Sequence, residues 1–229
     1  MSAENLSAVA GAVADPTRAR MLVALMDGRA WTARELAHGA GVTPSTATSH
    51  LNLLVDRGLL RERRQGRHRY VELAGPAVAH ALEAVVSLGE QPLPKVHSLR
   101  EATIDSALRR GRTCYDHLAG SLGVTITQSL IGNGVIDDSF ALTAQGRAWI
   151  EDTLATSLPA GPRPVTRECL DWTERRVHLG GALGALICST LHERGWVRGA
   201  ASSRAVTVTP SGTEALQRVL SIDVASATG

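Results

Sequence analysis

Apolar residues near the start of the chain recur at helical spacing behind residues that favour helix starts. Asp15-Pro16 combines an N-cap residue with proline at the first helical position. The apolar positions behind it predict one helix, which ends at Gly28: Met21, Leu22, Leu25 and Met26. Thr32 and Glu35 have the spacing of a capping box, which predicts that a second, short helix begins there.

A third helix is predicted from Thr43-Pro44 to about Arg57, after a tight turn at Gly41-Val42. Two short helices joined by a turn that contains glycine are typical of a helix-turn-helix motif. One face of the third helix is apolar and is expected to face the core: Ala47, Leu51, Leu54 and Val55. The opposite face and its flanks carry small polar side chains: Ser45, Thr46, Thr48, Ser49, His50 and Asn52. Such groups can read base edges in the major groove, so the pattern favours DNA recognition over a merely solvated helix, which more often carries Lys and Glu.

A β-hairpin with a basic tip is predicted after this helix. Apolar residues flank Gln65-Gly66, a two-residue turn signal: Leu59, Leu60, Tyr70, Val71 and Leu73. The segment 57–69 has six arginines and one acid, Glu62, and so a net charge of +5, whereas residues 98–229 are neutral. Alone, the hairpin could be a solvated charged loop. Beside a recognition helix it is predicted to hold phosphates or enter the minor groove through Arg64, Arg67, His68 and Arg69.

These motifs together resemble the ArsR/SmtB family of bacterial winged-helix repressors over roughly residues 6–88. The matching segments occur in unbroken order: Ala14–Leu22 (ADPTRARML), Glu35–Ala37 (ELA), Gly41–Leu51 (GVTPSTATSHL), Asp56–Leu60 (DRGLL) and Gly66–Tyr70 (GRHRY). The resemblance implies a winged helix-turn-helix and a homodimer on a palindromic operator, with recognition helices in successive major grooves. It also implies release from DNA when an effector binds.

The usual metal ligands of that family are missing from the matching positions. Many metal-sensing members have a cysteine pair just before the motif's first helix, but residues 28–35 contain no cysteine. The apolar helix predicted at 76–89, which corresponds to the dimer helix, offers only His80 and Glu83, at i, i+3. We therefore expect neither a cofactor nor a metal site.

The second half of the chain contains an internal repeat. Gln91–Pro94 (QPLP) suits a domain boundary, so we predict a DNA-binding and dimerisation domain at 1–90, a linker at 91–97 and a sensor domain at 98–229. His117–Val135 and His178–Trp196 share eight of nineteen residues at an offset of 61. The predicted copies, 98–157 and 166–222, each follow the order helix, helix, short strand, helix. The fold class is thus mainly α with short β-hairpins, a winged helix-turn-helix followed by two half-winged-helix-like repeats packed about a pseudo-twofold axis.

Cysteine and histidine in the repeat are the candidate sensor residues: Cys114, His117 and Cys169. The repeat puts Cys114 and Cys169 in equivalent places, so a pseudo-twofold axis could bring them together. Cys114 and His117 are expected to share a helix face, as are Cys188 and His192. Core packing, thiol or redox sensing, and metal binding all remain open for the cysteines. The repeated glycines are expected to permit close helix crossing: Gly120, Gly123, Gly181 and Gly184.

Composition narrows the function classes. Hydrophobic residues at 44% and charged residues at 20% indicate an ordinary soluble globular protein. Aromatic residues are only 3%, which argues against a protein that stacks single-stranded bases on rings. The chain has no long apolar run and no secretion signal, so we expect a cytoplasmic protein without membrane contact. An odd cysteine count argues against a disulfide framework.

The sequence thus predicts a sequence-specific DNA-binding regulator. We expect a homodimeric repressor, released by a thiol, redox or small-molecule effector sensed in the second half. A thiol-dependent enzyme is one alternative, with Cys114, Asp116 and His117 as its catalytic set, although no glycine-rich phosphate loop or nucleophile elbow is present. An adaptor that binds a partner protein through the repeat is the other.

Overall fold

The computed structural model describes residues 2–66, 68–87, 99–200 and 203–223. The chain forms two compact units, Met1–Leu82 and Glu83–Gly229. The predicted linker at 91–97 lies outside the described residues. None of the described helices is long and apolar enough to cross a membrane.

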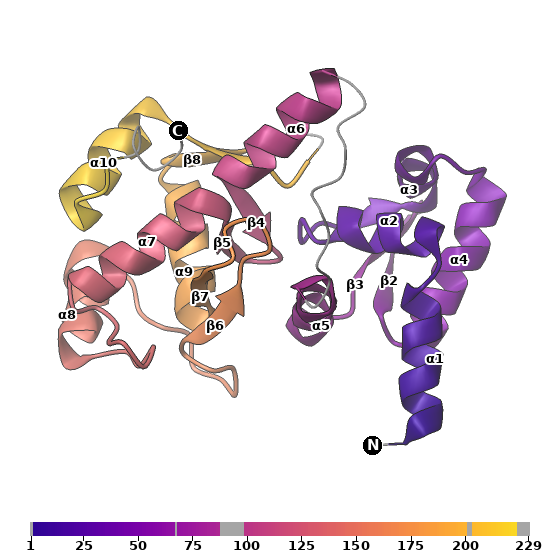
Figure 1. The fold of residues 1–229 in the computed structure, drawn as a ribbon, viewed down its shortest axis with the longest axis horizontal. Helices are drawn as coiled ribbons and strands as arrows, with labels where there is room; N and C mark the ends of the chain where they lie inside the picture. The colour runs from indigo at the N-terminus through magenta and orange to yellow at the C-terminus, as the bar shows by residue number, and fades with distance from the viewer. Residues whose placement is uncertain (1, 67, 88–98, 201–202, 224–229) are drawn as a thin grey trace. The chain divides into compact units, whose positions relative to one another are not determined.

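The first unit is a winged helix-turn-helix (Figure 1). Its elements in chain order are α1 (Ala3–Val13), α2 (Pro16–Leu25), β1 (Trp31–Thr32), α3 (Ala33–Ala40), α4 (Pro44–Asp56), β2 (Leu60–Gln65) and β3 (His68–Leu73), followed by α5 (Pro76–Ser87), which carries the boundary between the units. The strands form an antiparallel sheet in the order β1-β3-β2. Helices α3 and α4 form the helix-turn-helix, and the β2–β3 hairpin is the wing.

The predicted caps of this unit are confirmed. The Asp15 side chain accepts a hydrogen bond from the backbone N–H of Arg18, 2.9 Å away, and Thr32 and Glu35 form a reciprocal capping box. Gly41 ends α3 with a φ of +71°, a left-handed conformation that glycine adopts without strain and that lets α4 turn away sharply. The apolar face of α4 packs inward, with Leu51 and Leu54 fully buried.

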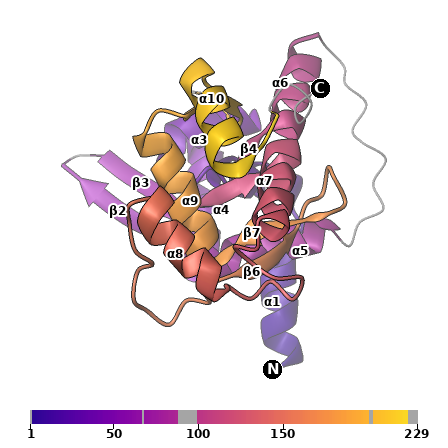
Figure 2. The same ribbon diagram turned by 90° about the vertical axis from the view of Figure 1, so that its left-hand side faces the viewer.

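The second unit is mostly helical with small antiparallel hairpins (Figures 1 and 2). Its first segment contains α6 (Leu99–Arg110), β4 (Arg112–Cys114), β5 (His117–Ala119), α7 (Gly120–Gly132) and α8 (Ala144–Thr153). Its second segment contains β6 (Arg167–Leu170), β7 (Val177–Gly180), α9 (Gly181–Glu193), β8 (Val197–Gly199), β9 (Val206–Val208) and α10 (Pro210–Leu220). Helix α7 packs on β7 and α9 packs on β5, so each segment lies against the other.

The predicted order of elements in this unit is partly wrong. Cys114 and His117 do not share a helix; they are directly opposed across the β4–β5 hairpin, whose turn is Tyr115-Asp116. Tyr115 has a φ of +60°, and a tyrosine in a left-handed turn position gives no sequence signal for a hairpin. The hydroxyls of Thr143 and Thr209 cap α8 and α10, because each accepts a hydrogen bond from a helical N–H.

The glycines of the repeat allow close packing. Gly120 does so against another helix, because a Cβ there would overlap the carbonyl oxygen of Arg109 in α6, whereas Gly123 and Gly184 do so against their own hairpins. A Cβ on Gly123 would overlap the carbonyl oxygen of Leu118, at the end of the strand that precedes its own helix. A Cβ on Gly184 would overlap the carbonyl of Leu179 and approach the Cβ of His117 to 3.2 Å. These glycines therefore let α7 and α9 fold back tightly onto their hairpins.

Candidate DNA-binding surface and buried cysteine-histidine cluster

Helix α4 presents the polar face that the sequence predicts. Ser45, Thr46, Ser49 and Asn52 are exposed, and Thr48 is half-buried. The hydroxyls of Thr48 and Ser49 donate to backbone carbonyls one turn earlier in the helix, at 2.8 and 3.3 Å. Since a hydroxyl that donates within the helix keeps lone pairs free, these side chains can still accept from base donors.

His50 supports the helix packing rather than extending the exposed face. Its ring is half-buried, and its Nδ1 lies 3.2 Å from Nη1 of Arg18. Arg18 in turn donates to the carbonyl oxygens of Gly11 and Ala12 at the end of α1. His50 thus connects α4 to the corner between α1 and α2.

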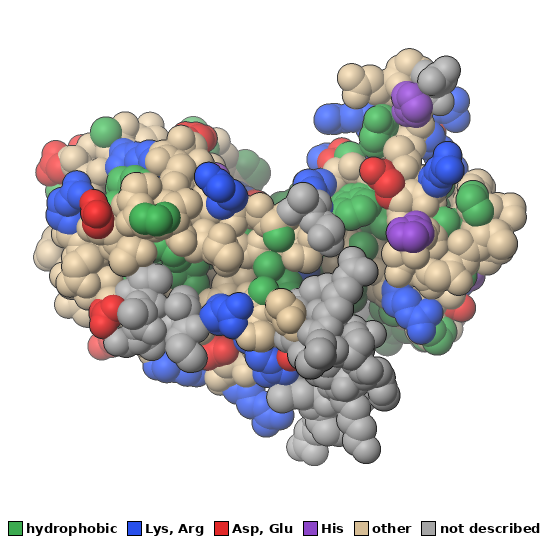
Figure 3. Space-filling view, turned by 90° about the horizontal axis from the view of Figure 1, so that it is seen from above, with side chains coloured by type: hydrophobic (Ala, Val, Ile, Leu, Met, Phe, Trp, Pro, Cys, Tyr) green, Lys and Arg blue, Asp and Glu red, His purple; other side chains and the backbone are tan. Residues whose placement is uncertain are grey.

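The wing carries its arginines on a regular antiparallel ladder. Gln65 is paired with His68, so the turn begins at Gly66 and not at Gln65 as predicted. Gly66 has a φ of +57°, which suits the first position of such a turn. Arg67 lies outside the described residues. Figure 3 shows blue Lys and Arg side chains on the projection at the upper right, which carries this hairpin.

The Glu62 carboxylate contacts two of the described arginines near the tip of the wing. Nε of Arg64 and Nε of Arg69 each lie 2.8 Å from the Glu62 carboxylate, and hydrogen bonds from both arginines lower the pKa of Glu62. The Arg64 side chain is 78% exposed and the Arg69 side chain 27%. Two guanidinium groups on one carboxylate leave positive charge available to a phosphate.

The second unit brings four cysteine and histidine side chains together. Cys114 opposes His117 in the β4–β5 hairpin, and Cys169 opposes His178 in the β6–β7 hairpin. The two sulfur atoms lie 3.8 Å apart, and the two Nε2 atoms 3.2 Å apart. All four residues are buried. The sequence predicted the proximity of the two cysteines but missed His178 as a site residue, although the repeat aligns it with His117.

Charged groups surround this cluster in similar ways on both sides. Nδ1 of His117 lies 3.3 Å from Asp116, which Arg163 holds through two contacts of 2.6 and 3.0 Å. Although burial opposes it, hydrogen bonds from His117 and Arg163 lower the pKa of Asp116 to about 2. Nδ1 of His178 lies 3.3 Å from Oδ2 of Asp171, an ion-pair distance without good hydrogen-bond geometry.

Among the described residues of the unit, the Asp171 carboxylate accepts the most hydrogen bonds. Arg112, which is fully buried, donates to it at 2.9 Å, and the N–H of Gly120 donates at 2.7 Å. Although burial opposes it, contact with His178 and the charge of Arg112 hold the pKa of Asp171 well below its usual range. Against the effect of burial, contacts with Asp171 and Cys169 raise the pKa of His178 to about 9.

The other candidate features of the second unit are structural. Cys188 is buried in the apolar core, and burial raises its pKa to about 12. His192 is exposed, so Cys188 and His192 form no site.

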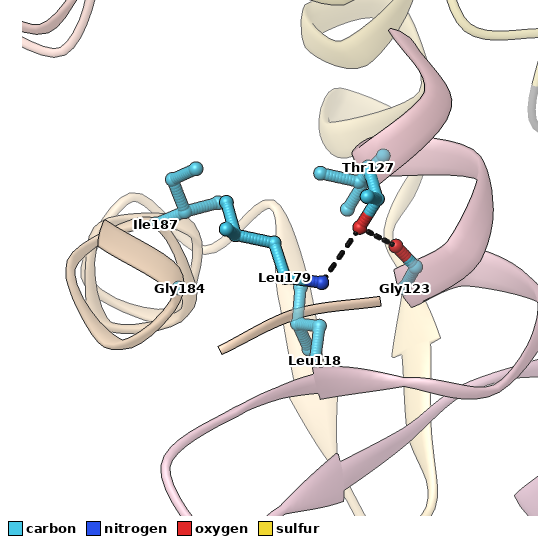
Figure 4. A pocket seen from close by; sticks show the side chains of 7 residues that line it. Leu118, Gly123, Thr127, Leu179, Gly184 and Ile187 are labelled. Atoms are coloured by element: carbon cyan, nitrogen blue, oxygen red, sulfur yellow. Dashed lines mark hydrogen bonds between the residues drawn. The ribbon is translucent and has the colours of Figure 1, made fainter. Parts of the chain in front are cut away.

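A pocket between α7, β7 and α9 has room for little more than a water molecule (Figure 4). The Thr127 hydroxyl beside it accepts from the N–H of Leu179 and donates to the carbonyl of Gly123, which ties α7 to β7.

The winged fold, the polar α4 face and the basic wing define a helix-turn-helix DNA-binding protein. A family model described as a helix-turn-helix domain matches residues 13–63. The chain is 35% identical over 225 residues to the uncharacterized HTH-type transcriptional regulator YdfF of Bacillus subtilis, covering 96% of this chain and 99% of the relative. The chain belongs to the ArsR family of helix-turn-helix transcriptional regulators. This relative is described as a regulator of transcription.

Other similarities cover the first unit. The regulator CmtR of Mycobacterium tuberculosis is 38% identical over 88 residues, which is 38% of this chain and 74% of CmtR. Its NMR structure, described as a cadmium metal-sensor, covers 38% of this chain and 94% of that one, with 36% identity and a TM-score of 0.31. The homodimeric winged helix-turn-helix domain of Mb0332 from Mycobacterium bovis covers 42% of this chain and 87% of that one, with 27% identity and a TM-score of 0.37.

Proposed function

We propose that this protein is a homodimeric, sequence-specific repressor that binds a palindromic operator in the cytoplasm and leaves it when the second unit senses an effector. The observation that carries the proposal is the exposed hydroxyl and amide face of α4 beside an arginine-rich wing. A face without long charged side chains can approach base edges closely. The wing supplies the phosphate contacts that fix its register on the duplex.

The residues divide into two roles. The α4 side chains that read bases are Ser45, Thr46, Thr48, Ser49 and Asn52. His50 fixes the angle of that helix through its contact with Arg18. Wing residues bind the phosphate backbone: Arg64, Arg67, His68 and Arg69. In a homodimer, two such surfaces meet half-sites about one helical turn apart, which is why the operator should be palindromic. Size measurement of the free protein and of its DNA complex tests the dimer directly.

Replacing Ser49 with alanine is expected to change sequence preference. Loss of one base contact should reduce discrimination at the matching base pair by about 1–3 kcal/mol, with little change in non-specific binding. Anisotropy titrations against an operator and its single-base variants measure this. Equal affinity changes for all sequences would contradict a base-reading role for Ser49.

Replacing Arg64 with alanine is expected to weaken binding to all DNA sequences alike. Because each neutralised phosphate releases counterions, loss of one contact should reduce the slope of log K against log salt by about 0.9. Arg218→Ala is the charge-matched control, since Arg218 is exposed on α10 in the second unit. An unchanged slope in Arg64→Ala, or an equal change in both variants, would refute the wing assignment.

We place the effector response at Cys114, His117 and Cys169. These thiol and imidazole groups lie together where the two segments of the second unit meet. A thiol-directed effector is expected to release the wild-type protein from DNA but not the Cys114→Ser/Cys169→Ser variant. Cys188→Ser is the control, because that thiol lies in the apolar core and should not alter the response. Identical release of all three proteins would show that the effector acts elsewhere.

A further inference from the structure

We propose that Cys114, His117, Cys169 and His178 bind one zinc ion in the second unit. This inference deepens the proposed function. A regulatory role for the zinc site rests on the proposal that the second unit senses the effector. Each hairpin contributes one cysteine and the histidine directly opposite it. Opposed residues of an antiparallel pair point to the same face, so each hairpin presents a sulfur and a nitrogen side by side. The four ligand atoms all lie within 4.8 Å of one another.

The sulfur–sulfur and nitrogen–nitrogen separations match those of a tetrahedral zinc ion. With Zn–S of about 2.3 Å and Zn–N of about 2.0–2.1 Å, tetrahedral geometry separates two sulfurs by about 3.8 Å and two nitrogens by about 3.3 Å. The observed separations are 3.8 Å between the sulfurs and 3.2 Å between the Nε2 atoms. A disulfide needs sulfurs about 2.05 Å apart, and both cysteines are free.

A carboxylate lies beside Nδ1 of each imidazole, which favours metal binding through Nε2. Asp116 faces Nδ1 of His117 and Asp171 faces Nδ1 of His178, each at 3.3 Å. A carboxylate at Nδ1 favours the proton on that nitrogen, so that the lone pair of Nε2 can bind a metal. The two Nε2 atoms point at each other, an arrangement in which a shared cation satisfies both lone pairs.

Charge balance also favours a divalent cation. With zinc bound, two thiolates and two neutral imidazoles neutralise an ion of charge +2. Of the three described carboxylates beside the cluster, Asp116 and Asp171 are matched by Arg163 and Arg112, and Glu83 accepts a hydrogen bond from the Cys169 thiol at 3.0 Å in this structure. Both histidines are 0% exposed, so an uncompensated charge here would be costly. Two sulfur and two nitrogen donors in a tetrahedron suit zinc better than magnesium or calcium, which prefer oxygen.

The site joins the two segments of the second unit. One cysteine-histidine pair comes from the segment that contains α7 and the other from the segment that contains α9. A site with four protein ligands and no open position is typical of structural zinc. Binding or loss of the ion would therefore alter how the two hairpins are held together.

The test is the metal content of the full-length chain purified under reducing conditions. We expect one zinc ion per chain by elemental analysis, and chelator-stripped wild-type protein should rebind one zinc with nanomolar or tighter affinity. Cobalt substitution should give the absorption of a tetrahedral ion with thiolate ligands. Cys169→Ser should lose stoichiometric zinc, while Cys188→Ser should keep it. Reduced, folded wild-type protein that neither holds nor rebinds stoichiometric zinc would overturn the proposal, and so would loss of zinc from Cys188→Ser alone.

Replacing Asp116 with asparagine tests the positioning of the histidines. The variant should keep the stoichiometry of one zinc but bind it about 10–100-fold more weakly. Asp152→Asn, which changes an exposed carboxylate on α8, should leave zinc affinity unchanged. Equal affinities of the two variants would show that Asp116 does not orient His117. These measurements use no DNA, so failure of the zinc site and failure of the repressor proposal are separate results.

Discussion

Replacement of Asp171 by asparagine is expected to destabilise the second unit by about 3–5 kcal/mol, because it leaves the guanidinium of Arg112 buried without its counter-ion. Both side chains of this pair are 0% exposed, so water cannot take over the lost interaction. The Asp171 carboxylate also accepts hydrogen bonds from the backbone N–H groups of Gly120 and Thr173, at 2.7 and 2.9 Å, and the substitution removes the negative charge of this acceptor. Asparagine keeps the shape of aspartate, so the change is one of charge and not of packing.

Urea unfolding of the full chain, followed by tryptophan fluorescence, measures this effect. Three of the four tryptophans lie in the second unit, and Trp172 stacks under the Arg112 guanidinium at 4.9 Å, so the relevant transition is visible. Chelator present throughout removes any contribution from bound metal. Asp152→Asn is the control, since an exposed change usually costs less than about 0.5 kcal/mol. If Asp171→Asn lowers the free energy of unfolding by less than about 1 kcal/mol, the Arg112–Asp171 ion pair is not buried in solution.

Replacement of Gly123 by alanine is expected to lower the free energy of unfolding of the second unit by about 3 kcal/mol, the upper part of the usual range for overpacking. The added Cβ would overlap the backbone oxygen of Leu118, which cannot rotate away as a side chain can. In most helix interiors the same change stabilises, because alanine has the higher helix propensity. The sign and the size of the change in the free energy of unfolding therefore both distinguish close packing from ordinary helix behaviour.

Gly132→Ala is the matched control for this prediction. Gly132 ends the same helix, α7, and a Cβ there would meet nothing within 4 Å. Its replacement should be neutral or stabilise by up to about 1 kcal/mol. The same urea experiment compares the two variants. If Gly123→Ala unfolds at the same urea concentration as Gly132→Ala, the tight return of α7 onto β5 is not present in solution.

Local sequence signals account for most of the first unit. Asp15, Thr32 and Thr43 are caps whose side chains act within three residues, so their hydrogen bonds follow from spacing alone. The exposed and buried faces of α4 follow from helical periodicity in the same way. The wing turn was predicted one residue too early, because glycine can occupy either position of a two-residue turn.

The second unit depends on contacts between residues far apart in the sequence. The β4–β5 hairpin was predicted as helix because the Tyr115-Asp116 turn lacks glycine and asparagine, and the apolar residues around it have no strand alternation. His178 joins His117 across 61 residues, a contact that only packing of the two segments creates. The repeat indicated that Cys114 and Cys169 are equivalent, but it could not show that the histidines point between them.

Selection of genomic DNA fragments by the purified wild-type protein, followed by footprinting, tests the central claim most directly. We expect one protected palindrome, with half-sites about 10–10.5 base pairs apart. The variant with Ser45, Ser49 and Asn52 all changed to alanine should remain folded, since these side chains are exposed, but lose that selection while keeping salt-dependent, non-specific binding. Failure of the folded wild-type protein to select any fragment at low salt would contradict the account. Selection of the same palindrome with equal affinity by the triple variant would contradict the assignment of α4 as the helix that reads bases.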